Sequence, residues 1–154
     1  SDTQIANFNC PGQLIISGAM GNLPKAAEFA QAKGASRILP LQVSGAFHSP
    51  LMQPAREGLF EIIAGLAFRD PDVPIIANIT AKPMTKAEEI KTELIEQLCN
   101  CVQWQRSIEY MVSNGVSTIY EMGPGKVLAG LIKRINKDID IRNIGDVAAI
   151  KGLS

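Results

Sequence analysis

A chain of 154 residues, 46% of them hydrophobic, is long enough to bury a core and most simply forms one compact domain, although a two-lobed or incomplete domain fits the same numbers. Its 15 basic and 15 acidic side chains balance, which argues against a general attraction to nucleic acid or to an anionic membrane. We find no bilayer-spanning apolar run and no signal-like N-terminus, so we expect a soluble, cytoplasmic protein.

Short apolar runs alternate with amphipathic segments along the chain, a pattern typical of an α/β fold around a mostly parallel sheet. Extended segments at 6–8 and 13–17 flank a Pro-Gly turn, and a helix follows over 22–33 and ends at a glycine. Residues 37–43 are predicted to form a strand. Ser49 and the following proline are expected to cap and begin the next helix.

That next helix is expected to bury one apolar face, made of Leu59, Ile62, Ile63 and Leu66. A buried strand is predicted over 75–79, followed by a helix that Thr85 caps. The later elements are helical structure over 108–112 that ends at a glycine, a strand over 117–122, a last clear helix over 127–135 and an edge strand over 139–144. A boundary between two regions is expected near residues 42–46.

The three cysteines, Cys10, Cys99 and Cys101, predict neither a disulfide framework nor a zinc site. Their number is odd, and the last two lie too close in sequence for an ordinary bridge. A structural zinc site would need further ligands, and the chain has a single histidine. We therefore expect free thiols that are buried or half-buried.

Gly123-Pro124-Gly125-Lys126 has the residue types of a phosphate-binding loop but not the spacing. The required earlier glycine would fall at Tyr120, and Val127 occupies the position of the magnesium-binding hydroxyl. A tight turn between a strand and a helix is the better interpretation, with Lys126 still available to an anionic partner.

The only histidine, His48, lies between an apolar run and a helix start, a usual position for a general base. No Gly-x-Ser-x-Gly pentapeptide supplies a nucleophile for it. Ser44 and Ser49 are its near neighbours in sequence and are poorly placed to approach it, and Cys10 is a weak alternative. We infer that a nucleophile would come from a segment outside these residues.

Four motifs, in this order, resemble the malonyl-CoA:acyl-carrier-protein transacylase family. They are residues 5–13 (IANFNCPGQ), residues 45–52 (GAFHSPLM), Gln97-Leu98 with Val102-Gln103-Trp104, and residues 121–128 (EMGPGKVL). Each motif alone is moderately specific, but four in order make a strong signal, and the resemblance covers nearly the whole chain.

This resemblance implies the C-terminal portion of an α/β-hydrolase-like acyltransferase domain with an inserted ferredoxin-like subdomain. Residues 1–42 would be the later part of that small subdomain, and residues 43–154 would belong to the large domain. The family's nucleophilic serine, oxyanion-hole donors and substrate-carboxylate arginine come from the earlier half. The isolated chain is therefore expected to be inactive.

The resemblance also assigns site residues. His48 would be the general base, and the main-chain carbonyl of Gln97 would orient its ring, so that the Gln97 side chain should matter less than its backbone. Phe47 would favour malonyl over methylmalonyl groups, because its ring fills the space that an α-methyl group needs.

The implied reaction moves a malonyl group from coenzyme A to a serine and then to the phosphopantetheine thiol of acyl carrier protein. Coenzyme A is then a substrate, and no metal or redox cofactor is expected. Candidate residues for docking the acidic carrier protein are Lys126, Lys133, Arg134 and Lys137. Self-association through an incomplete sheet is also expected.

Two other hypotheses fit the sequence less well. One is a non-catalytic interaction module that binds acyl carrier protein through its basic helix. The other is an unrelated α/β protein with a structural His48, which would leave four ordered motif matches to coincidence.

Overall fold

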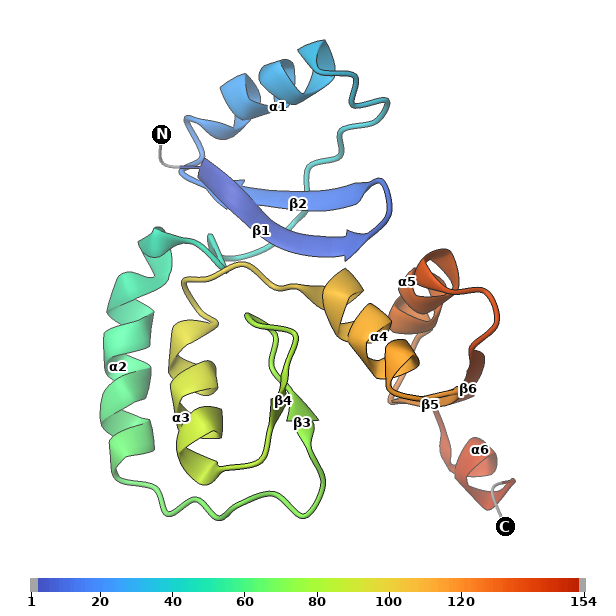
Figure 1. Cartoon of the computed structure of the whole chain (residues 1–154). Helices are drawn as coiled ribbons and strands as arrows, with labels where there is room; N and C mark the ends of the chain where they lie inside the picture. Colours follow the sequence, from blue (N-terminus) through green and yellow to red (C-terminus); the bar gives the residue numbers. More distant parts are fainter. Residues whose placement is uncertain (1–2, 153–154) are drawn as a thin grey trace.

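The computed structural model describes residues 3–152, and these residues form a mixed α/β fold with three two-stranded sheets. Figure 1 shows three groups of elements: an N-terminal hairpin with one helix, a pair of helices beside a short hairpin, and a C-terminal group of helices around a parallel strand pair. The prediction of a mostly parallel sheet is wrong for these residues. Of the three strand pairs, only the one in the C-terminal group is parallel.

The N-terminal hairpin consists of β1 (Thr3–Cys10) and β2 (Gln13–Gly18), which pair antiparallel. Gly12 makes the turn at φ +76°, a backbone conformation that side chains disfavour. The helix α1 (Leu23–Ala32) follows, and the chain leaves it through Gly34 at φ +97°. The structure thus confirms these strands and this helix.

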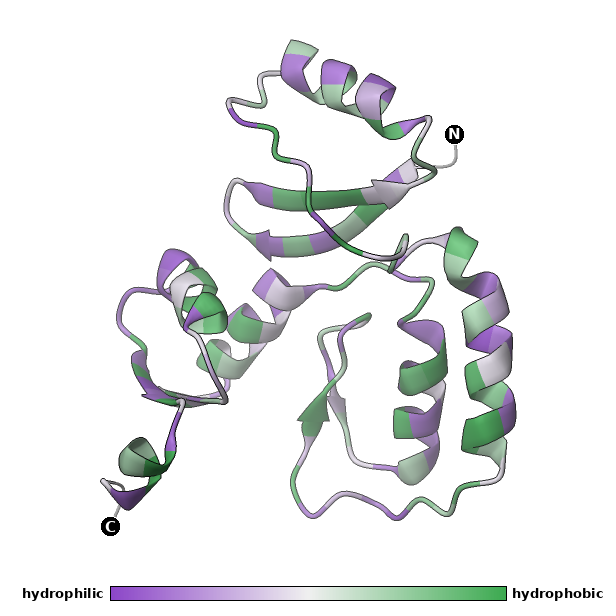
Figure 2. Cartoon of the chain, turned by 180° about the vertical axis from the view of Figure 1, so that it is seen from behind, coloured by the Kyte–Doolittle hydropathy of each residue, from purple (hydrophilic) through white to green (hydrophobic). Residues whose placement is uncertain are grey.

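The strand predicted over 37–43 is wrong: the segment is irregular. A strand requires a neighbouring backbone to pair with, and none of the described strands pairs with this one. Its apolar side chains are exposed, and Val43 reaches 65% exposure. The connection from α1 towards α2 accordingly contains hydrophobic (green) stretches outside any element in Figure 2.

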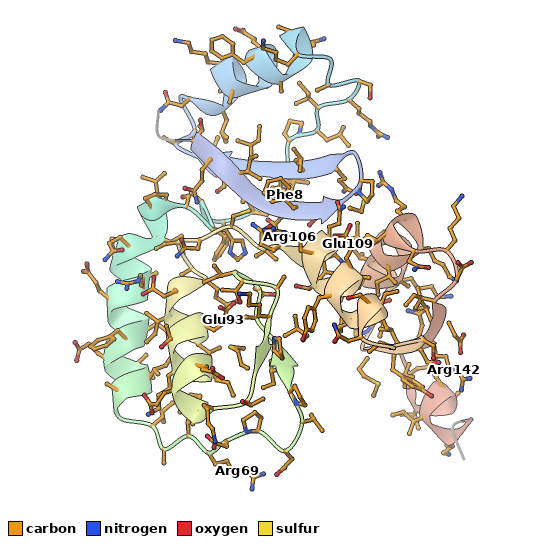
Figure 3. All side chains as sticks on the ribbon, in the orientation of Figure 1. Phe8, Arg69, Glu93, Arg106, Glu109 and Arg142 are labelled. Atoms are coloured by element: carbon orange, nitrogen blue, oxygen red, sulfur yellow. The ribbon has the colours of Figure 1, made fainter. Side chains whose placement is uncertain are left out.

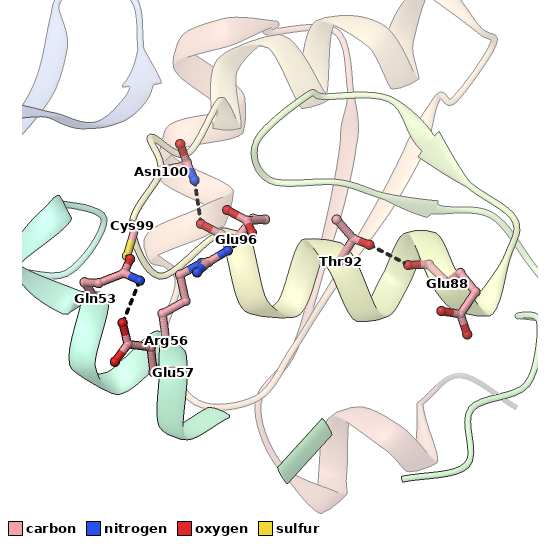
Figure 4. A network of polar contacts seen from close by, with 8 residues as sticks. All are labelled: Gln53, Arg56, Glu57, Glu88, Thr92, Glu96, Cys99 and Asn100. Carbon is pink, nitrogen blue, oxygen red and sulfur yellow. Dashed lines mark hydrogen bonds and ion pairs between the residues drawn. The ribbon is translucent and has the colours of Figure 1, made fainter. Parts of the chain in front are cut away.

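Two helices lie side by side in the second group, α2 (Gln53–Ala64), preceded by the short 3₁₀ turn η1 (Pro50–Met52), and α3 (Ala87–Glu96). Arg56 on α2 pairs with the carboxylate of Glu96 on α3 (Figure 4), and this bond raises the pKa of the arginine. The predicted apolar face of α2 is only partly buried, because Ile63 is covered whereas Ile62 is 63% exposed.

The predicted buried strand over 75–79 is shorter and more exposed than expected. It consists of β3 (Ile75–Ile76), which pairs antiparallel with β4 (Pro83–Met84). Beyond β3 the chain turns back through a tight loop, in which the N–H of Ala81 donates to the carbonyl of Ala77. Glu93 of α3 faces this loop in Figure 3 and accepts a hydrogen bond from the N–H of Ile79 at 3.0 Å.

The predicted cap of α3 at Thr85 is wrong by one residue, because Lys86 occupies the capping position. The carboxylate of Glu89, inside the helix, accepts the N–H groups of Thr85 at 2.8 Å and of Lys86 at 3.0 Å. Asp70 accepts the N–H of Ala87 and the Lys86 ammonium, each at 2.8 Å. Both bonds lower the pKa of Asp70, and the bond from Lys86 has the larger effect.

The C-terminal group has the main hydrophobic cluster of the described residues. It comprises α4 (Trp104–Ser113), β5 (Thr118–Met122), α5 (Val127–Ile135) and β6 (Asp140–Ile144). The cluster is centred on Ile108, Ile132 and Ile139. The structure confirms these four predicted elements, and β6 pairs parallel with β5. A short final helix, α6 (Val147–Lys151), was not predicted, although Asp146 caps it through the N–H of Ala149 at 2.8 Å.

Hydrogen bonds join the N-terminal hairpin to the rest of the chain. The backbone of β1 bonds to Val102, which accepts the N–H of Phe8 at 2.9 Å and donates to the carbonyl of Ala6 at 2.8 Å. At the other end of the hairpin, Arg134 of α5 donates to the side chain of Gln13 at 2.7 Å. Across residues 3–152, no helix has both the length and the apolar character needed to cross a membrane.

Candidate active site

The loop before η1 holds His48 in a left-handed backbone conformation with φ +60°. Such a conformation is uncommon for a residue other than glycine, and where it persists, surrounding contacts usually fix it. Here the N–H of His48 donates to the carbonyl of Leu98 at 2.9 Å. The loop is thereby attached to the chain just beyond α3.

The imidazole ring of His48 is half-buried, and its Nδ1 lies 2.7 Å from the main-chain oxygen of Gln97. A carbonyl oxygen can only accept a hydrogen bond, so Nδ1 is the nitrogen that holds the proton in this contact. Nε2 then keeps its lone pair in the neutral ring. It makes no hydrogen bond to any residue in the described part of the chain. The ring is oriented at one nitrogen and open at the other.

Gln97 can serve as an acceptor because it directly follows α3, where the last helical carbonyls have no partner within the helix. Its side chain is also engaged, since its amide oxygen accepts a hydrogen bond from Asn78 at 2.7 Å. The carbonyl of Asn78 in turn accepts the N–H of Gln103 at 2.7 Å. The β3–β4 loop therefore holds the residue that orients His48, a link that the sequence did not indicate.

Phe47 is 42% exposed and lies beside His48 on the same loop. Its ring packs over Gly45, where an added Cβ would lie 3.4 Å from the ring. Ser49, only 1% exposed, occupies the capping position of η1 without capping it, because its hydroxyl donates back to the carbonyl of Ala46 at 2.6 Å. The expectation that Ser49 caps the helix is therefore wrong in its chemistry.

The three cysteines are free, as expected, and none has the surroundings of an activated thiolate. Cys10 is 1% exposed, with its thiol 3.5 Å from the side-chain oxygen of Gln13. Burial raises the pKa of the thiols of Cys99 and Cys101, which disfavours their nucleophilic form. Among residues 3–152, we find no group of three or more histidine, cysteine or acidic side chains that could bind a metal ion.

The turn between β5 and α5 has glycines in the left-handed region, Gly123 at φ +116° and Gly125 at φ +96°. The start of α5 already has an anion of its own. The carboxylate of Glu121 accepts the N–H groups of Leu128 at 2.9 Å and Ala129 at 3.0 Å. This carboxylate disfavours phosphate binding there, in agreement with the interpretation of a tight turn.

Two of the four candidate docking cations are used within the chain. The ammonium of Lys133 donates to the carbonyls of Lys137 at 3.0 Å and Ile139 at 2.6 Å. Arg134 is bound to the turn of the N-terminal hairpin through Gln13 and Pro11. In contrast, the ammonium groups of Lys126 and Lys137 have no partner among the described residues. These two lysines are the cations that remain free for a partner.

No protein-family model matches the chain. Curated relatives do match it: it is 45% identical over 148 residues to the malonyl CoA-acyl carrier protein transacylase of Bacillus subtilis and 40% identical over 147 residues to that of Staphylococcus aureus. Each alignment covers 96% of this chain, but only 47% and 48% of the respective relative.

Solved structures agree with these relatives. An acyl-carrier-protein-S-malonyltransferase from Bartonella henselae superimposes with a TM-score of 0.92 at 42% identity, over 98% of this chain and 48% of that one. A complex of a type II PKS acyl-carrier protein with its malonyl-transacylase gives a TM-score of 0.92 at 37% identity, again over 48% of the neighbour and 97% of this chain. The chain is thus a homologue of the malonyl CoA-acyl carrier protein transacylases and spans about half the length of the relatives it matches.

Proposed function

We propose that this chain supplies the histidine half of a site that transfers a malonyl group from coenzyme A to the phosphopantetheine thiol of acyl carrier protein. The observation that carries the proposal is the His48 ring, with Nδ1 bound to the Gln97 carbonyl and Nε2 open. A neutral imidazole with one free ring nitrogen is suited to general-base catalysis. The names of the related transacylases include an acyl carrier protein, and that of the Bacillus subtilis relative also includes malonyl CoA.

In the first half-reaction, Nε2 of His48 takes the hydroxyl proton of a serine while the serine oxygen attacks the thioester carbonyl of malonyl-CoA. The carbon–sulfur bond then breaks, and the coenzyme A sulfur leaves with the proton from Nε2. In the second half-reaction His48 takes the proton of the phosphopantetheine thiol, whose sulfur attacks the serine ester. The bond between the acyl carbon and the serine oxygen then breaks, and the serine oxygen takes the proton back from Nε2. The serine comes from a segment outside these residues, and the reaction needs no metal or redox cofactor.

The Gln97 carbonyl performs the orienting role that a carboxylate performs in a serine–histidine–aspartate triad. It fixes which ring nitrogen holds the proton, and its partial negative charge stabilises the imidazolium that forms when Nε2 is protonated. It does so without introducing a second titrating group.

Phe47 is the residue that we propose to select malonyl over methylmalonyl groups. Its ring is exposed and packs over Gly45 on the loop that carries His48, and in the proposed site it would occupy the space that an α-methyl group needs. Excluding one methyl group gives only modest discrimination, so Phe47→Ser should raise the methylmalonyl-to-malonyl ratio of kcat/KM by about 10-fold. An unchanged ratio would remove Phe47 from substrate selection.

The same homology supports a finer description of the fold. Residues 1–42 form the later part of a ferredoxin-like subdomain in this proposal, and residues 43–154 form the C-terminal part of an α/β-hydrolase-like acyltransferase domain. The unpaired apolar segment over 37–43 supports this division, because it is where a strand would find its partner in a complete subdomain.

The test is a chimera in which this chain replaces the matching half of the Bacillus subtilis relative, whose other half we expect to supply the nucleophile. We expect the chimera to transfer radiolabelled malonyl from coenzyme A to acyl carrier protein through a covalent malonyl-enzyme, and the chain alone to transfer none. A folded chimera that forms no malonyl-enzyme would refute the proposal. If the chain alone then still bound acyl carrier protein, the alternative of a non-catalytic docking module would be favoured.

A further inference from the structure

The N-terminal strand contributes one side chain to the surroundings of His48. Gln4 of β1 is half-buried, and its side-chain nitrogen donates hydrogen bonds to the main-chain carbonyl of His48 and, at 3.2 Å, to that of Cys99. These residues are far apart in sequence, so the side chain of Gln4 joins three separate segments: β1, the histidine loop and the chain beyond α3.

The two carbonyl groups cannot bond to each other, because both are acceptors only. A group that links them must present two hydrogens from one position. The amide NH₂ of glutamine does this, whereas a hydroxyl has one hydrogen and a carboxylate has none at neutral pH. The chemistry of the position therefore calls for a double donor.

Three successive carbonyls beyond α3 fix the histidine through three different donors. The Gln97 carbonyl takes the ring N–H, the Leu98 carbonyl takes the backbone N–H of His48, and the Cys99 carbonyl shares the Gln4 amide with the His48 carbonyl. The left-handed conformation of His48 costs free energy and holds only while such contacts persist. Without the donor at Gln4, the carbonyls of His48 and Cys99 would lose the group that links them, and the loop would be held at fewer points.

We infer that Gln4 is a positioning residue, which holds the backbone of His48 so that Nδ1 meets the Gln97 carbonyl and Nε2 stays unprotonated. The claim that Gln4 sets the orientation of the ring concerns this chain alone. The claim that Gln4 affects catalysis rests on the malonyl transfer proposed above.

The geometric part can be tested by nitrogen-15 NMR of the ring, since His48 is the only histidine and its signals need no assignment. Above the pH range where the ring is charged, the two nitrogen shifts report which nitrogen holds the proton. We expect the Nδ1–H form to predominate in the unaltered chain. It should fall to a minority in Gln4→Met and Gln4→Glu, which keep the length of the side chain but remove its donors.

Gln4→Lys restores a multiple donor at the same position and should restore the Nδ1–H form. Gln105→Met, at another half-buried glutamine, whose side chain bonds only to Glu109 among the described residues, is the matched control and should leave the ring unchanged. An Nδ1–H majority that survives in either folded donor-free variant would overturn the inference. The inference would also be overturned if Gln4→Met lost the Nδ1–H form and Gln4→Lys failed to restore it, with circular dichroism showing that both variants are folded.

The catalytic part is measured in the chimera with the Bacillus subtilis half. Gln4→Met should lower kcat by about 10-fold with little change in KM for malonyl-CoA, because the base is misdirected while the substrate still binds. A chimera that is inactive with Gln4 intact would refute the proposed function and leave the NMR result standing. An altered ring with full activity would refute only the catalytic role of Gln4.

Discussion

Two turns that lead into helices, residues 44–50 and residues 123–126, satisfy their polar groups in different ways. The second is complete in itself: glycines take the left-handed positions, and the Glu121 carboxylate bonds to the first free N–H groups of α5. In the first, a histidine takes the left-handed position at a cost that glycine would not incur. Its Nε2 is left without a partner in the described part of the chain.

This difference separates a structural turn from a site. At residues 123–126 every unusual feature has a local explanation, and a ligand would have to displace Glu121. At residues 44–50 the fold retains a strained backbone and an open basic nitrogen, which local structure does not require. Residue types alone would have placed a binding site at residues 123–126, where a glycine-rich turn is followed by lysine, and not at residues 44–50.

The largest expected effect is on the first turn. In the chimera, His48→Ala should lower kcat/KM for malonyl transfer by about 10²- to 10⁴-fold, the usual contribution of a general base. His48→Gly should lose as much activity and yet be more stable than His48→Ala by about 1 kcal/mol in urea unfolding, because glycine adopts φ +60° without strain. Equal stability of the two variants would show that the loop relaxes and that the strain is absent.

The next effect concerns the support behind Gln97. Asn78→Ala leaves the Gln97 side-chain oxygen without its donor, and we expect kcat to fall about 5- to 10-fold as the carbonyl that orients His48 loses its position. Asn114→Ala is the control, at an exposed asparagine that bonds only near the end of α4. Equal effects of the two substitutions would mean that the Gln97 backbone needs no support from its side chain.

For the second turn we expect a change in stability and none in chemistry. Glu121→Ala removes the acceptor of two N–H groups at the start of α5 and should lower the free energy of unfolding by about 1–2 kcal/mol. Glu109→Ala, at an exposed carboxylate on α4, should change it far less. If Glu121→Ala altered the protonated nitrogen of His48, the two turns would not be independent.

The smallest expected effect is at the start of α3, whose other end bears the site. Since Lys86 and the N–H of Ala87 lower the pKa of Asp70, the carboxylate favours the folded state above the unfolded pKa. That contribution is lost as the pH falls through the folded pKa. Carbon-13 NMR should show Asp70 titrating below an ordinary aspartate, and Lys86→Met should move it back upwards. An ordinary pKa in the unaltered chain would contradict the contact.

Local patterns predicted the elements that local physics determines. The hairpin around Gly12 and the elements from α4 to β6 follow from turn residues and apolar spacing, and they form as predicted. The strand over 37–43 fails because pairing needs a partner segment, which a local pattern does not reveal. The predicted cap of α3 fails because the N–H of Ala87, in the first turn of the helix, bonds to the carboxylate of Asp70, which is distant in sequence.

The site divides in the same way. His48 was singled out from its position in the sequence, whereas Phe47 and Gln97 were predicted only through family resemblance. The contact between His48 and the Gln97 carbonyl is present. Gln4 and Asn78 were missed, because each acts across a distance in sequence that no spacing rule covers. A polar side chain in the half-buried β1 was the one available signal for Gln4.

The bonds from Arg134 to the hairpin turn also constrain the order in which the chain can fold during synthesis. Gln13 and Pro11 precede their partner by 121 and 123 residues. At about 5–20 residues per second, the hairpin waits on the order of 6–25 seconds on the ribosome before that arginine is made. Until then the turn of the hairpin lacks the donors that attach it to α5.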